Sequence, residues 1–202
     1  MLDWKQLVLE SDEQLASRDI AEVNLACAAG LPGSVKIDYD LCRRKLDEWT
    51  RYCGWFIERV MPYFRDGKHE EYPDSEPRFR IHALITALQR DCGVRYHLDK
   101  KSDDAKFESE DSFLHGILQG DGGTCASLPV LYVSVGRRLG YPLKLVEAKR
   151  HLFARWDDPM TGERFNIEGS GEGVSFFPMN TIAQGGSPCR RGRSMPSAFR
   201  AL

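Results

Sequence analysis

The chain has 202 residues, of which 42% are hydrophobic and 29% charged, and its formal net charge is −2. This length allows one domain with a substantial core. The charge balance does not favour nucleic acid as a partner, and no apolar run reaches membrane-spanning length. The acidic start MLDWKQLVLESDEQ lacks the cationic and apolar regions of a secretory signal. We therefore expect a cytoplasmic protein that binds neither nucleic acid nor membrane; its oligomeric state stays open.

Residues 1–77 are predicted to form an N-terminal helical region. Apolar residues over 3–29 favour one or two helices, and the stretch GLPGS at 30–34 interrupts them. Asp38 or Asp40 can cap a further helix that runs to about Phe64. Another helix is expected over 78–92, after a polar segment.

The hydrophobic period changes after Gly140. Residues 141–149, 151–158 and 163–169 alternate as strands do, and PMTG supplies a hairpin turn between the last two. Helices followed by an antiparallel sheet define an α+β fold. We assign 78–180 to a core and 181–202 to a basic, flexible tail, all within one structural domain.

The stretch QGDGGTC ends at Cys125, where a long apolar helix is expected to begin. The start of a helix favours an anion, and the thiolate is the nucleophilic form of cysteine. Thr124 can cap this helix, and the glycines before it, including Gly123, leave room for a substrate backbone. Taken alone, Cys125 is better explained as a packed small hydrophobe, like the other cysteines. No CxxC pair or zinc spacing is present, so no metal is expected.

A cysteine nucleophile needs a base and a group that orients the base. His151 opens a predicted strand and is the best-placed histidine. Asn166 and Glu168 lie two residues apart on the next strand, so their side chains share one face. Either side chain could orient the imidazole.

The segments GTCASLPVLYVSVGRRLGYPLK, HLFARW and RFNIEGS together resemble the transglutaminase-like superfamily, whose core has a papain-like fold. The upstream run RFRIHALITALQRDCGVRYHLD is similar to a bacterial branch of it. The resemblance implies a triad of Cys125, His151 and an acid at Glu168, where the family carries Asp. Asn166 is the rival, because papain-like peptidases use Asn in this role.

The resemblance also suggests residues around the cleft. Gln119 stands six residues before Cys125, as does the papain-like glutamine that donates to the oxyanion together with the backbone N–H of the cysteine. Gly123 and Thr124 are expected at the cleft. Trp156 either walls the cleft or belongs to the core.

Such a site would attack an amide bond of a protein or peptide substrate and form a thioester. Water would then give hydrolysis, and an amine would give acyl transfer. No cofactor is implied. The alternative is a binding module, in which the same fold holds a peptide with little or no turnover.

Overall fold

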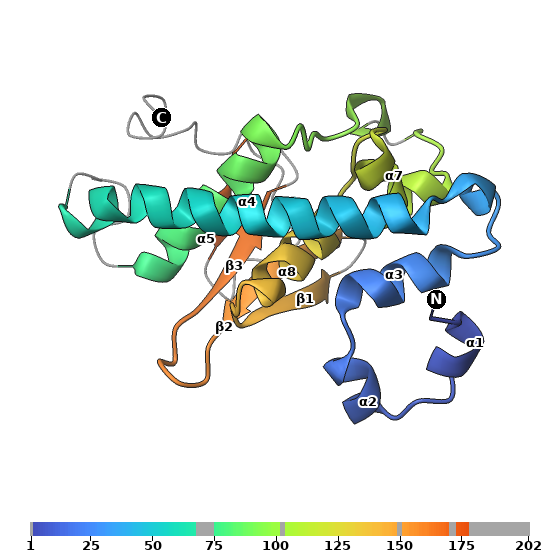
Figure 1. Cartoon of the computed structure of the whole chain (residues 1–202), viewed down its shortest axis with the longest axis horizontal. Coiled ribbons are helices and arrows are strands. Elements are labelled where there is room, and N and C mark those ends of the chain that lie inside the picture. Colours follow the sequence, from blue (N-terminus) through green and yellow to red (C-terminus); the bar gives the residue numbers. More distant parts are fainter. Residues whose placement is uncertain (1, 68–74, 102–103, 149–150, 170–172, 178–202) are drawn as a thin grey trace.

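Helices precede an antiparallel sheet along the chain, which confirms the predicted α+β class (Figure 1). The computed structural model describes residues 2–67, 75–101, 104–148, 151–169 and 173–177. The helices are α1 (Trp4–Leu7), α2 (Asp12–Ser17), α3 (Ile20–Ala28), α4 (Tyr39–Arg65), α5 (Glu76–Thr86), α6 (Ser109–Ser112), α7 (Leu114–Gln119) and α8 (Leu128–Arg138), with single 3-10 or π turns η1 (Ser34–Lys36), η2 (Ala87–Asp91) and η3 (Leu98–Lys101). The strands are β1 (Leu143–Ala148), β2 (His151–Asp157), β3 (Arg164–Glu168) and β4 (Ser175–Phe177).

Side-chain caps divide the N-terminal segment into three short helices, so the prediction of one or two was wrong. Ser11 Oγ accepts from the backbone N–H of Gln14 at 3.3 Å and starts α2. Asp19 Oδ1 accepts from the N–H of Ala21 at 2.7 Å and starts α3. Each cap satisfies N–H groups of a new first turn, and this lets the chain change direction between the helices.

The cap predicted for the long helix is confirmed at Asp38, whose carboxylate accepts from the N–H of Leu41 at 2.8 Å. The helix α4 then runs for 27 residues and crosses the whole molecule (Figure 1). It buries one apolar face and exposes a charged one. Among the described residues, no helix combines the length and the apolar composition needed to cross a membrane.

Helix α8 is the buried centre of the fold. It contacts α4 on one side and β1 and β2 on the other, and every residue from Leu128 to Gly136 is buried. A helix covered on all sides must be apolar on all sides, which explains the sequence LPVLYVSVG. The segments that precede and follow α8 are therefore anchored to the core.

The strands pair in the order β1-β2-β3-β4, each antiparallel to the next. The three predicted strands are confirmed with slightly narrower bounds, and the turn PMTG ends at Gly162 with a φ of 74°. Strand β4 was not predicted, because three residues show no alternation. Antiparallel pairing places the start of β2 beside the end of β3. The predicted basic tail lies outside the described residues.

Gly116 of α7 tests how tightly the short helices pack. A Cβ at this position would collide with the backbone carbonyl of Glu110. We expect Gly116→Ala to lower the free energy of unfolding by about 1–3 kcal/mol, measured by urea denaturation. Gly54→Ala in α4 is the matched control, because its Cβ would meet only the flexible Leu139 side chain at 3.1 Å. That variant should lie within about 1 kcal/mol of wild type, and equal effects at both positions would contradict this packing.

Candidate active site

Cys125 lies in a turn just before α8, not inside the first turn of the helix as the sequence suggested. The N–H of Leu128 donates to the carbonyl of Thr124 at 3.0 Å, which is a helical bond. The next bond would need an N–H at residue 129 for the carbonyl of Cys125, and proline has none. Pro129 therefore delays the regular helix until Leu128 and leaves Cys125 at its mouth.

A pair of hydroxyl groups fixes this turn against α6. Thr124 Oγ1 donates to the carbonyl of Asp111 at 2.7 Å and accepts from the N–H of Ala126 at 3.1 Å. Ser127 Oγ donates to the same carbonyl at 2.9 Å and accepts from the N–H of Thr124 at 3.0 Å. Both side chains are completely buried. Thr124 thus orients the backbone of Cys125, and Ser127 shares this task. No role was predicted for Ser127; it stands at the spacing of a capping box, a motif that usually carries Glu or Gln at this position.

His151 and Glu168 meet at one end of the sheet. His151 Nε2 and Glu168 Oε2 lie 2.5 Å apart, with side-chain exposures of 18% and 6%. The pairing of Ala154 with Ile167 sets this meeting: it places Glu168 diagonally across from His151 and on the same face of the sheet. Because the carboxylate bonds Nε2, the other ring nitrogen, Nδ1, is left for the thiol.

The rival acid position is occupied by a different interaction. Asn166 shares the face of Glu168, as predicted, but it stands opposite Arg155 in the register. Its Oδ1 accepts from Arg155 Nε at 2.8 Å, and its side chain is completely buried. Of the two candidates, Glu168 is the one that the structure places against His151.

The surroundings of His151 favour its protonated form. Hydrogen bonds with Cys125 and then with Glu168 raise the pKa of His151 to about 9, against the opposing effect of burial. The imidazole therefore stands between a thiol and a carboxylate, and both contacts stabilise the positive ring. This is the arrangement that a thiolate–imidazolium pair requires.

Helix α8 also supports the acid from behind. Tyr132 donates its hydroxyl to the carbonyl of Gly169 at 2.8 Å, and Gln89 Nε2 donates to the same carbonyl at 3.2 Å. Burial raises the pKa of Tyr132, so the hydroxyl keeps its proton. The residue after Glu168 is thereby tied to the core. Nothing in the apolar sequence around Tyr132 indicates this role.

An open cleft of about 440 Å³ lies over the thiol and is lined by Cys125, Ala126, Glu147, His151 and Leu152. The backbone N–H of Cys125 has no hydrogen-bond partner within the described part of the chain, so it can donate to an oxyanion. Within the same residues, no group of three or more His, Cys, Asp or Glu side chains is arranged to hold a metal ion.

Two residues considered for the cleft lie elsewhere, and for Trp156 the structure selects the core alternative. Gln119 donates to the carbonyl of Lys36 and accepts from the N–H of Asp38, both at 3.2 Å, so its amide ties α7 to the start of α4. Trp156 is buried in the core, where it stacks on Phe165 with 6.0 Å between the ring centroids.

Gly123 differs from its expected role in the same way. A Cβ there would lie 2.7 Å from Leu128 Cγ, so the glycine makes room for the core and not for a substrate. Its N–H donates to the carbonyl of Arg95 at 2.9 Å, which fixes the loop that leads to Cys125.

Comparison with known families agrees with this geometry. The model of the Transglutaminase-like superfamily matches residues 57–180, more than half of the chain. The chain therefore belongs to the transglutaminase-like superfamily. The match begins at Ile57 within α4, upstream of the boundary placed at residue 78. No curated protein and no solved structure matches the chain.

The raised pKa of His151 makes a prediction about stability. A histidine whose pKa is higher in the folded state stabilises the fold fully below its unfolded pKa of about 6.5, and this stabilisation disappears as the pH rises through about 9. We expect Glu168→Gln to have a free energy of unfolding about 1–3 kcal/mol lower than that of wild type at pH 6. At pH 9.5 the difference should be clearly smaller. Urea unfolding measures both values.

Glu147→Gln is the control for this experiment, because it removes an exposed carboxylate from the same cleft. The free energy of unfolding of Glu147→Gln should differ little from that of wild type, and by the same amount at both pH values. A Glu168→Gln difference that does not change with pH would show that the carboxylate does not support the imidazolium.

Proposed function

We propose that the protein is a cysteine enzyme that acts on amide bonds of a protein or peptide. The observation that carries this proposal is the position of His151, which contacts Glu168 at 2.5 Å and lines the same cleft as Cys125. Both partners raise the pKa of the imidazole. A cysteine that only packs in the core needs neither partner. Membership of the transglutaminase-like superfamily supports the same chemistry.

The proposed reaction begins with attack of Cys125 Sγ on the amide carbonyl carbon, while His151 holds the thiol proton. The carbonyl oxygen becomes an oxyanion that accepts a hydrogen bond from the backbone N–H of Cys125. His151 then gives its proton to the nitrogen, the C–N bond breaks, and ammonia or an amine leaves. A thioester between Cys125 and the acyl group remains.

The second half of the reaction releases the acyl group. His151, now neutral, takes a proton from water or from a primary amine as it attacks the thioester. Water gives a carboxylic acid, and an amine gives a new amide. The open shape of the cleft supports a protein or peptide as substrate, because such a chain can lie across it.

A reducing compartment suits this chemistry. Five cysteines are free within the described part of the chain, and the proposed thiol must stay reduced to react. We therefore propose the cytoplasm as the place of action, with no cofactor required for the steps above.

The direct test is turnover of a glutamine-containing peptide library, followed by ammonia release and by mass spectrometry of the products. We expect Cys125→Ser and His151→Ala each to lower turnover by at least about 10³-fold. Cys27→Ser is the matched control, because Cys27 is a free, exposed thiol away from the cleft, and it should keep full activity. If peptides bind in the cleft of the wild type but none is turned over, the proposal of an enzyme is wrong and the binding module is favoured.

The identity of the acid can be tested in the same assay. Glu168→Gln keeps the shape of the side chain but removes its charge, so it should lower turnover at least about tenfold. Asn166→Asp is the isosteric comparison, since the new carboxylate would face Arg155, and turnover should stay within about threefold. The reverse order of effects would assign the orienting role to Asn166.

A further inference from the structure

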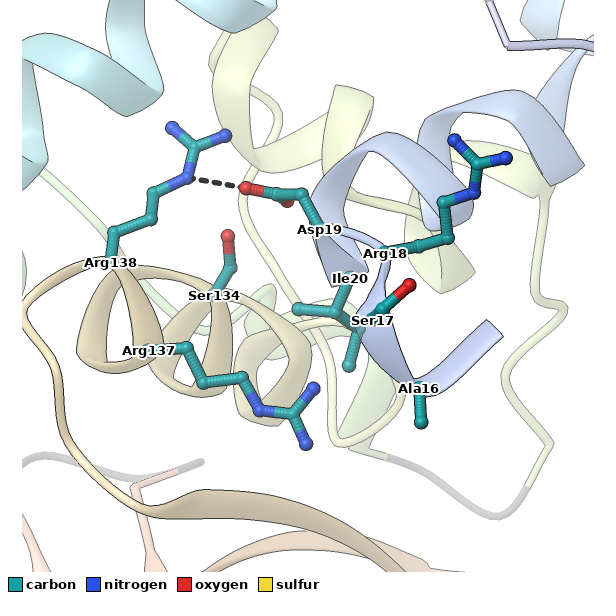
Figure 2. A pocket seen from close by; sticks show the side chains of 8 residues that line it. All are labelled: Ala16, Ser17, Arg18, Asp19, Ile20, Ser134, Arg137 and Arg138. Carbon is teal, nitrogen blue, oxygen red and sulfur yellow. Dashed lines mark hydrogen bonds and ion pairs between the residues drawn. The ribbon is translucent and has the colours of Figure 1, made fainter. Parts of the chain in front are cut away.

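A second pocket lies at the other end of α8 from Cys125. It has a volume of about 350 Å³, within the range of small-ligand sites. One wall is the connection between α2 and α3, and the other is the last turns of α8 (Figure 2). The lining residues are Ala16, Ser17, Arg18, Asp19, Ile20, Ser134, Arg137 and Arg138. The first wall lies outside the 57–180 region that the family model matches.

Arg137 offers an unused pair of donors to this pocket. Its Nε donates to the carbonyl of Leu143 at 2.7 Å, which fixes the side chain. Its two terminal nitrogens have no hydrogen-bond or ion-pair partner among the residues that the structure describes. Figure 2 shows the guanidinium extending toward the side of Ala16 and Ser17. A fixed guanidinium fork matches the two oxygens of a carboxylate or a phosphate.

The other charges around the pocket are already compensated. Arg138 Nε pairs with Asp19 Oδ2 at 2.8 Å (Figure 2), and its Nη1 pairs with Asp47 at 2.9 Å. Arg18 pairs with Glu10 at 2.6 Å, and its guanidinium points away from the pocket (Figure 2). One positive charge, that of Arg137, is therefore left for a ligand.

Ser134 provides an independent sign of a missing partner. Its side chain is 1% exposed, and its hydroxyl has no hydrogen-bond partner. In Figure 2 the hydroxyl points from α8 toward the Arg138–Asp19 pair. A buried hydroxyl without a partner costs about 1–3 kcal/mol, and an acceptor oxygen of a ligand would remove this cost.

We propose that this pocket binds a small molecule that carries one oxyanion group, a carboxylate or a phosphate. Arg137 forms the charged fork for the oxyanion, and Ser134 offers a separate donor on the side of the Arg138–Asp19 pair. Ile20 supplies an apolar wall for a short carbon chain. Such a ligand would join the N-terminal helices to α8 and so to the core of the enzyme.

The test is isothermal titration calorimetry of the full chain with two probes, inorganic phosphate and butyrate, against sodium chloride at equal ionic strength. We expect saturable 1:1 binding of at least one probe with a dissociation constant below about 10 mM. Binding of phosphate alone would identify a phosphate ligand, and binding of butyrate alone would identify a carboxylate. If neither probe binds in this range, the proposal is wrong.

Variants show whether the bound probe occupies this pocket. Ser134→Ala and Arg137→Gln should each weaken binding by about tenfold. Arg51→Gln is the matched control, because Arg51 is exposed and its Nε also donates to a backbone carbonyl, that of Asp47 at 3.3 Å, and it should leave binding unchanged. Without a probe, Ser134→Ala should unfold at the same urea concentration as wild type or a higher one, which excludes misfolding. Unchanged binding in both pocket variants would overturn the proposal.

Discussion

The contact between His151 and Glu168 is the interaction on which the rest of the site depends. It exists because β2 and β3 are antiparallel and pair Ala154 with Ile167, which brings the first residue of β2 near the last residue of β3. A slip of one residue would turn Glu168 to the opposite face of the sheet and leave the imidazole without its acid. The short turn that ends at Gly162 therefore sets the register that brings His151 and Glu168 together at the far end of the two strands.

Helix α8 connects the two halves of the site. The turn before it carries Cys125, and Tyr132 in its middle binds the carbonyl that follows Glu168. The helix is buried from Leu128 to Gly136. Because it is packed in the core, it holds both the thiol and the acid in fixed positions. Its last turns form one wall of the pocket between Arg137 and Asp19, where the N-terminal helices dock. A ligand in that pocket would contact the same helix that positions Cys125.

Much of this arrangement follows from local patterns in the sequence. The change from helical to alternating spacing after Gly140 predicted three strands, and Asp38 marked the start of α4. The glycine-rich approach to Cys125 and the histidine at the start of a strand indicated the candidate nucleophile and the candidate base. These signals are local, because a cap or an alternation is decided within a few residues.

What the sequence could not provide depends on contacts between distant segments. Asn166 and Glu168 share one face of β3, so only the register of β2 against β3 decides which of them contacts His151. In this register Asn166 stands opposite Arg155 and bonds it. Gln119 has the spacing of an oxyanion donor, yet its amide binds the segment before α4, more than eighty residues earlier. The position of Cys125 outside the helix was a missed local signal, since Pro129 removes the bond that would have included it.

The proposed chemistry requires that Cys125 and Glu168 hold His151 in its protonated form. The most direct measurement is an NMR titration of the protein with ¹³Cε1-labelled histidine, with the His151 signal assigned from the His151→Gln variant. We expect this signal to titrate with a pKa of about 9. A pKa near the ordinary histidine value of about 6.5 would contradict this expectation, because the two partners would then not stabilise the protonated ring beyond the opposing effect of burial.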